Sequence, residues 1–264
     1  MLMEEFRQLG HNVSVLFGDF TACIGDPGDQ KATRKQLTRE QTTANAKDWE
    51  NQVKKLINFE DPINPAHIVF NSSWLDKITL TEFIGWSAQT TVQRMLERDM
   101  FQKRIQENKP VHLHEFFYPL FQGIDSVALN ADVEVCGTDQ TFNALMGRQF
   151  VKTKLNKEKF CVIVQLMNHP VTKEPIMSKS KGTGVFLNRE AAMMFGEIMA
   201  LPDEVIEMLL LWNTRISRQE IQSLDIANKP REAKLFVATK IVEIFHGKDK
   251  SLEAQNHFIE TFSK

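Results

Sequence analysis

Three polar side chains interrupt an otherwise apolar stretch near the middle of the chain. In HLHEFFYPLFQGIDSVAL, Tyr118, Gln122 and Asp125 stand at i, i+4 and i+7, so a helix carries them on one face. The stretch is apolar almost all round, which predicts a buried helix, and a buried carboxylate without partners is costly. Two explanations stay open on these residues alone: a face that binds a polar ligand, or a helix end whose aspartate has internal partners.

Two junctions that follow predicted strands also carry polar groups. CGTDQTFN opens a helix after a strand, so Asp139 and Gln140 stand at the carboxyl edge of a sheet, where open α/β sheets bind ligands. Gly137 lets the backbone approach a sugar or phosphate closely, although the same residues suit a plain turn with an aspartate cap. GDFTACIGDP also follows a strand, and its Asp26 belongs to an Asp-Pro pair that often starts a turn.

A lysine-containing loop lies further along the chain. PIMSKSKG places Lys179 and Lys181 among serines and ends in a glycine. Such a run is typical of a solvated surface loop. It suits equally a mobile loop whose ammonium groups grip phosphates, and the choice depends on the rest of the sequence.

Two further polar segments have an ordinary explanation and a functional one. His112 and His114 form a His-x-His pair, but two ligands do not make a metal site, so a role at a loop or helix start is favoured. The basic segment 148–159 either meets the acceptor stem of an RNA or forms a solvated helix end.

The bulk composition limits the class of protein. The chain has 264 residues, 42% of them hydrophobic, enough for one large domain or two smaller ones with a sizeable core. The formal net charge of −2 gives no global attraction to nucleic acid. Three widely spaced cysteines indicate a reduced, cytoplasmic protein without a zinc site. No apolar run approaches the ~18 residues of a membrane span, and the start lacks a signal-peptide pattern.

Short apolar strands alternate with helices in the first part of the chain, and only helical patterns follow. This order predicts an α/β domain with a parallel sheet over 1–188 and a helical domain over 189–264. The predicted strands are 13–17, 67–70, 133–135 and 162–165.

In this order and spacing, FGDFTACIGDPGDQKATRKQLT, HEFFYPLFQGIDSVALNADVEVCGTDQTFN and MSKSKG resemble bacterial tyrosyl-tRNA synthetases, which are class I enzymes. The resemblance covers essentially the whole chain. It implies a Rossmann-like parallel sheet of the nucleotidyl-transferase type without its first strand, a helical domain, and a homodimer that uses the face around Leu113. It also implies that ATP and tyrosine form tyrosyl-adenylate and that the tyrosyl group passes to tRNA(Tyr). ATP is then a substrate accompanied by Mg²⁺, and the protein itself holds no metal.

The resemblance assigns a role to each polar residue that could bind tyrosine. Asp26, Tyr118 and Gln122 would surround the substrate ammonium, which needs acceptors. Asp125 would accept a hydrogen bond from the phenol hydroxyl, and Gln140 would lie near the substrate carboxylate.

The resemblance also assigns the ATP contacts. Gly137 would let the nucleoside approach, and Asp139 would hold the ribose hydroxyls. Lys179 and Lys181 would clamp the leaving pyrophosphate, with Arg34 on the opposing loop. Lys179 would also contact ATP. Displacement at the α-phosphate needs positioning and charge stabilisation more than covalent help from the protein.

Three departures from the family pattern limit what the resemblance implies. The His-Ile-Gly-His signature and the strand before it are absent, and the chain stops before the family's C-terminal RNA-binding domain. The family's Lys-Met-Ser-Lys-Ser begins here with Ile176, and Gln30 stands where the family usually has a basic residue. We therefore expect impaired tyrosine activation. The alternative is a catalytically silent synthetase-like protein that binds tyrosine or RNA.

Overall fold

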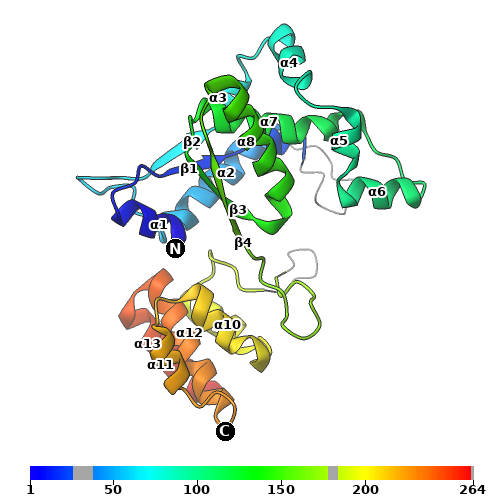
Figure 1. Cartoon of the computed structure of the whole chain (residues 1–264). Coiled ribbons are helices and arrows are strands. Elements are labelled where there is room, and N and C mark those ends of the chain that lie inside the picture. The colour runs from blue at the N-terminus through cyan, green and yellow to red at the C-terminus, as the bar shows by residue number, and fades with distance from the viewer. Residues whose placement is uncertain (26–37, 178–183, 263–264) are drawn as a thin grey trace. The chain divides into compact units, whose positions relative to one another are not determined.

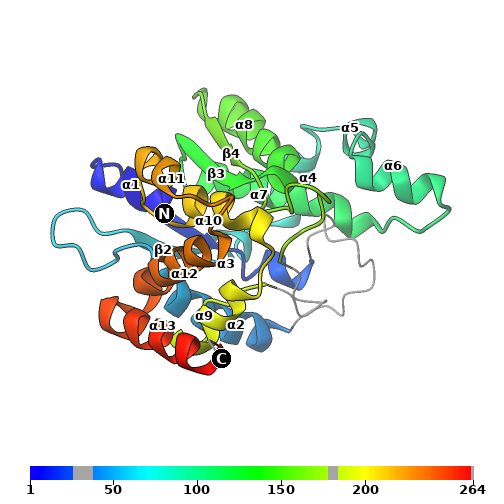
Figure 2. The same cartoon turned by 90° about the horizontal axis from the view of Figure 1, so that it is seen from below.

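The computed structural model describes residues 1–25, 38–177 and 184–262 (Figures 1 and 2). Backbone contacts divide the chain into two compact units. The sheet unit comprises Asn12–Glu50 and Asn64–Leu166, and the helical unit comprises Met1–His11, Asn51–Ile63 and Met167–Lys264. These limits differ from the predicted boundary near residue 189: the last segment of the helical unit begins at Met167, and the unit also includes two earlier segments. The two-domain division at 189 stays a prediction.

The sheet unit contains two pairs of parallel strands. β1 (Ser14–Phe17) pairs with β2 (His67–Phe70), and β3 (Val133–Gly137) pairs with β4 (Phe160–Val164). All four predicted strands are confirmed, with ends shifted by one or two residues. Within the described residues each pair is a separate two-stranded ladder. The apolar patterns predicted the strands but not this division, because a pattern does not determine which edges pair.

Two helices form the centre of the sheet unit. α7 (Phe117–Ala128) packs against α8 (Thr141–Leu155) around Leu120, Ile124, Met146 and Phe150, and the pair can be followed in Figure 1. Gly123 makes this contact possible, since a Cβ there would lie 2.7 Å from the Phe150 ring. α7 is therefore buried, as predicted.

Shorter helices connect β2 to α7. They are α3 (Ser72–Leu75), α4 (Leu80–Ser87), α5 (Val92–Leu96) and α6 (Asp99–Gln106), preceding the 3₁₀ helix η2 (Leu113–Phe116). Charges at helical spacing in the sequence predict a single helix over roughly 90–106, which is wrong. The backbone is extended at Arg98, and Gln102 Nε2 donates to the carbonyl oxygen of Leu96, which caps the end of α5. α5 and α6 extend away from the strands in both views.

Among the described residues of the sheet unit, two α-helices begin with a capping box. The spacing of Thr38 and Gln41 predicts a capping box, and the structure confirms it: the two residues exchange hydrogen bonds at the start of α2 (Arg39–Val53). α4 begins with a second capping box between Thr79 and Glu82.

After residue 188, every regular element that the structure describes is a helix; earlier in the helical unit, Asn168 and Pro175 form an isolated β-bridge. The helical unit contains α1 (Leu2–Gln8), α9 (Ala191–Met199), α10 (Ile206–Asn213), α11 (Arg218–Ser223), α12 (Pro230–His246) and α13 (Lys248–Phe262), with the 3₁₀ helix η5 (Asp203–Val205). α12 and α13 lie side by side (Figure 1). Gly247 joins them with φ of +87°, a conformation that favours glycine. Of the helices that the structure describes, none is long and apolar enough to span a membrane.

Candidate active site

Asp125 is a buried carboxyl group on α7, with only 4% of the residue exposed. Trp74 Nε1 donates to its Oδ1 at 2.8 Å, and Asn71 Nδ2 donates to its Oδ2 at 3.2 Å. The aspartate thus has internal partners, which was one of the two explanations that the sequence left open. Each carboxylate oxygen can accept a second hydrogen bond, so the partners do not exclude a ligand.

Both partners of Asp125 follow the carboxyl end of β2, and the residues after β1 hold one of them in turn. Asn71 directly follows β2, and its Oδ1 accepts from the backbone N–H of Phe20 at 3.0 Å. Its Nδ2 also donates to Thr21 Oγ1 at 3.1 Å, in the 3₁₀ helix η1 (Thr21–Cys23). Asp19 Oδ1 accepts from the Ser72 N–H and so ties the two strand ends together. The orientation of Asn71 is therefore fixed by the backbone.

Burial is the largest influence on the ionisation of Asp125. It raises the pKa of the carboxyl from 3.8 to about 7. The hydrogen bonds from Trp74 and Asn71 act in the opposite direction, and the negative charges of Glu134 and Asp19 add to the rise. A carboxyl that titrates near neutral pH beside the ends of parallel strands is a recognised mark of a functional site.

The other two polar residues of the predicted face also lie on α7. Gln122 is half-buried, and its Nε2 donates to Glu134 Oε1 on β3 at 2.9 Å. Tyr118 lies one turn earlier and is also half-buried. Gln122 therefore contacts β3 through Glu134, whereas Asp125 contacts Asn71, which directly follows β2.

The residues after β3 form a compact turn, the 3₁₀ helix η3 (Thr138–Gln140). A Cβ on Gly137 would lie 2.5 Å from Asp139 Oδ1, so a side chain at position 137 would displace the Asp139 carboxylate. Gln140 Nε2 donates to Asp139 Oδ2 at 3.0 Å, and Gln140 Oε1 accepts from Asn143 Nδ2 at 2.8 Å. Asp139 makes no side-chain cap of η3 or α8, which removes the plain capping role. Its carboxylate is exposed and available to a ligand.

Several candidate residues lie outside the described part of the chain. These are Asp26, Gln30, Arg34, Lys179 and Lys181.

Ile176, at the position of the family's first loop lysine, is described. It is 9% exposed and belongs to the hydrophobic core of the helical unit, with Met194 and Phe195.

Sequence reasoning missed the side chains that hold the face on α7: Thr21, Asn71, Trp74, Glu134 and Lys159. Asn71 follows β2 directly, so the rule used for Asp139, which looks at the ends of parallel strands, could have found it. Glu134 carried a weaker signal, a charge inside an apolar strand.

The basic segment 148–159 is largely neutralised by acids. Lys152 pairs with Glu158 at 2.7 Å, and Lys157 pairs with Asp132 at 2.7 Å. Lys154 lies over the ring of Trp86. These contacts favour the solvated helix end over an RNA-binding surface.

The histidine pair has a local role. The rings of His112 and His114 stack 5.7 Å apart, and the His112 N–H donates to Glu115 at the start of η2. No group of three or more possible metal ligands occurs among the residues that the structure describes.

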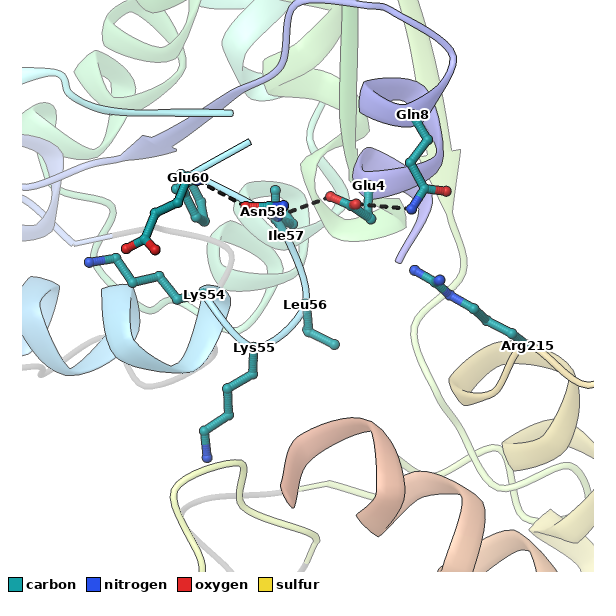
Figure 3. A pocket seen from close by; sticks show the side chains of 10 residues that line it. Glu4, Gln8, Lys54, Lys55, Leu56, Ile57, Asn58, Glu60 and Arg215 are labelled. Atoms are coloured by element: carbon teal, nitrogen blue, oxygen red, sulfur yellow. Dashed lines mark hydrogen bonds between the residues drawn. The ribbon is translucent and has the colours of Figure 1, made fainter. Parts of the chain in front are cut away.

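The helical unit contains a separate cavity of about 390 Å³ (Figure 3). Its lining includes Glu4, Lys54, Lys55 and Arg215 but none of the candidate residues. Glu4 accepts hydrogen bonds from Gln8 and from the Asn58 N–H there, as the dashed lines show. Its pKa falls to about 2, chiefly because of the hydrogen bond from Arg7. The negative charge of Glu4 is therefore used within the protein.

Known proteins resemble this chain along nearly its whole length. The profile of the family described as "tRNA synthetases class I (W and Y)" matches residues 1–263. The tyrosine–tRNA ligase of Carboxydothermus hydrogenoformans is 41% identical over 265 residues, which cover 98% of this chain and 63% of that protein. The tyrosine–tRNA ligase of Aquifex aeolicus is 40% identical, over 99% of this chain and 66% of that protein. The chain thus spans about two thirds of the length of these relatives.

Solved structures support the fold. A C-terminally truncated mitochondrial tyrosyl-tRNA synthetase of Aspergillus nidulans superposes with a TM-score of 0.77 at 22% identity, over 97% of this chain and 78% of that one. The tyrosyl-tRNA synthetase of Archaeoglobus fulgidus, solved with L-tyrosine, gives a TM-score of 0.67 at 16% identity, over 96% of this chain and 83% of that one. The predicted Rossmann-like α/β fold is confirmed. This chain belongs to the class I tRNA synthetases of the tryptophan and tyrosine family.

Proposed function

We propose that the chain is the catalytic core of a tyrosine–tRNA ligase. Such an enzyme joins tyrosine to ATP as tyrosyl-adenylate, releases pyrophosphate and transfers the tyrosyl group to tRNA(Tyr). The observation that carries the proposal is the buried Asp125, fixed by Trp74 and Asn71, in a chain about 40% identical to tyrosine–tRNA ligases. A phenol hydroxyl is a donor, and the carboxylate of Asp125 is a buried acceptor whose orientation is fixed by two hydrogen bonds.

The tyrosine contacts follow from donor and acceptor chemistry. The substrate ammonium has three donors and no acceptor, so the oxygens of Asp26, Tyr118 and Gln122 suit it. Asp125 takes the phenol hydroxyl, and the amide NH₂ of Gln140, which has two donors, suits the substrate carboxylate. These five residues form the proposed tyrosine site.

The ATP contacts use the turn after β3 and two loops. The exposed carboxylate of Asp139 accepts hydrogen bonds from the ribose, and Gly137 leaves room for the nucleoside. Lys179, Lys181 and Arg34 carry the positive charge that stabilises the departing pyrophosphate. Mg²⁺ enters with ATP as part of that substrate.

The test is tyrosine-dependent exchange of labelled pyrophosphate into ATP. Tyrosine should support exchange at a reduced rate, because the first loop lysine is replaced by Ile176, and tryptophan and phenylalanine should not support it. Equal exchange with tryptophan would assign the chain to the other branch of its family.

One observation favours the alternative, a protein that binds tyrosine without activating it. Ile176 replaces the family's first loop lysine, and its side chain is buried in the core. Tyrosine binding without any exchange would support this alternative.

We also propose a cytoplasmic homodimer. Apolar side chains are exposed on the segment from α4 to η2: Leu80, Ile84, Val92 and Leu113. A large apolar surface is typical of a protein interface. Sedimentation should therefore give a dimer for the native chain and a monomer for Leu113→Asp, and an unchanged mass would exclude this surface.

A further inference from the structure

The amide group of Gln122 is held by a carboxylate that no substrate role requires. Gln122 Nε2 donates to Glu134 Oε1 at 2.9 Å, across from α7 to β3. Ser126 Oγ, one turn further along α7, donates to Glu134 Oε2 at 3.3 Å. The side chain of Glu134 is 19% exposed, so this contact is largely shielded from water.

Lys159, the residue directly before β4, completes the group. Its side chain is fully buried, and its ammonium donates to Glu134 Oε2 and, at 3.1 Å, to the carbonyl oxygen of Ala144. An unpaired ammonium in this place would cost several kcal/mol, and even a paired one gains little stability over apolar side chains of similar size. Stability alone therefore does not explain a buried Lys159–Glu134 pair.

The main chain leaves space for this pair. Gly147 on α8 faces it, and a Cβ there would lie 2.3 Å from Ser126 Oγ and 2.7 Å from Lys159 Nζ. Side chains from α7, β3 and the residue before β4 thus converge on a space that a single methyl group on α8 would fill. The arrangement involves four separate segments of the sheet unit.

Hydrogen-bond polarity gives this group a function. The ammonium of Lys159 can only donate, and the ionised carboxylate paired with it can only accept. Gln122 must therefore turn its NH₂ toward Glu134, which leaves Oε1 as the acceptor on the other side of the amide. The substrate ammonium needs an acceptor.

We propose that Glu134, held by Lys159, is a positioning residue that fixes the Gln122 amide with its carbonyl oxygen available to the ammonium of tyrosine. This inference rests on the proposed function, because it deepens the assignment of Gln122 to the tyrosine site. Glu134 itself touches no substrate and acts through Gln122.

The substitution Glu134→Gln tests the polarity without changing the size of the side chain. The buried Lys159 ammonium would attract the amide oxygen of the new side chain, so its NH₂ would face Gln122. Gln122 would then turn its own oxygen toward position 134 and present NH₂ to the substrate ammonium, which repels it.

The measurement is calorimetric titration of the 264-residue chain with two ligands. Tyrosine carries the ammonium, and 3-(4-hydroxyphenyl)propanoate lacks it. Glu134→Gln should weaken tyrosine binding by about 10- to 100-fold, the range for losing a hydrogen bond to a charged group, and should change the propanoate by less than about 2-fold. Adding Gln122→Glu to Glu134→Gln should restore most of the tyrosine affinity, because a carboxylate at 122 accepts from both sides.

Two more variants separate positioning from general damage. Glu158→Gln removes an exposed carboxylate that also pairs with a lysine, and it should change neither affinity. Gly147→Ala displaces Lys159 and Ser126 without removing a charge, and it should weaken tyrosine more than the propanoate. This variant serves as the test if Glu134→Gln does not fold.

If Glu134→Gln weakens the binding of both ligands equally, or does not weaken tyrosine binding, the positioning role of Glu134 is wrong and the proposed function still stands. If the native chain binds neither ligand, the proposed function fails and this inference fails with it. A tyrosine-selective loss with recovery in the double variant supports both.

Discussion

The raised pKa of Asp125 makes the stability of the protein depend on pH in a calculable way. In the folded chain the carboxyl titrates near 7, against 3.8 for the ordinary group. Between these values the folded state binds more protons than the unfolded state, so stability falls as pH rises. At about 1.4 kcal/mol per pH unit, the ionised carboxyl costs about 4 kcal/mol above pH 7. About 2–3 kcal/mol of this cost arises between pH 5 and pH 8.

Asp125→Asn removes the titration and keeps the shape of the side chain. The amide oxygen introduced at position 125 can still accept from Trp74, but the new NH₂ would face the NH₂ of Asn71, at a cost of about 1–3 kcal/mol. The variant should therefore be less stable than the native chain at pH 5 and equal or more stable at pH 8.

Urea unfolding of both proteins at four pH values between 5 and 8 measures this change. The difference in unfolding free energy should shift by about 2–3 kcal/mol in favour of Asp125→Asn across that range. The exposed Asp132→Asn is the control and should show a shift below about 0.5 kcal/mol. A difference that stays constant for Asp125→Asn would show that this carboxyl is already ionised at pH 5 and would refute the reasoning.

Three other predictions follow from contacts of single residues. The affinity for tyrosine should increase from pH 5 to pH 7, by up to about tenfold per pH unit, because ionised Asp125 accepts a hydrogen bond from the phenol. Equilibrium dialysis measures this change, and phenylalanine is the control because its binding should not follow the titration of Asp125. Gly123→Ala should lower the free energy of unfolding, measured in urea, by about 1–3 kcal/mol, because the new Cβ would lie 2.7 Å from the Phe150 ring. Gly85→Ala on α4, where the space around the glycine is open, should leave the stability unchanged or raise it. Ile176→Lys should lower the melting temperature, because it buries an ammonium in an apolar core. Ile176→Leu is the control and should change the melting temperature little. An equal effect of the two substitutions would show that position 176 is not in the core.

The sequence predicted the parts of the fold that local patterns determine. Four strands and the buried helix α7 follow from apolar periodicity, and the capping box at Thr38 follows from residue types. The break between α5 and α6 could not be predicted in this way, because it depends on the hydrogen bond that the Gln102 side chain donates to the carbonyl oxygen of Leu96. The pairing of strands also depends on edges that a linear pattern does not specify.

In the candidate site, too, local spacing was predictable from the sequence and contacts between distant residues were not. The sequence placed Gln122 and Asp125 on one face of α7 because their spacing is helical. It did not predict that Glu134 and Asn71 hold them, since those contacts join residues 12 and 54 positions apart. Position 176 was interpreted only as a missing loop lysine, and the structure shows that the Ile176 side chain is part of a hydrophobic core.

Selectivity for tyrosine over phenylalanine tests the central claim most directly. A site that hydrogen-bonds the substrate hydroxyl rejects the analogue without it by ~10⁵, a value measured on tyrosyl-tRNA synthetases themselves. Equilibrium dialysis of the native chain and of Asp125→Ala with both amino acids measures the part that binding contributes. The account predicts that the native chain prefers tyrosine strongly and that Asp125→Ala loses far more affinity for tyrosine than for phenylalanine. Equal losses for the two amino acids would contradict it.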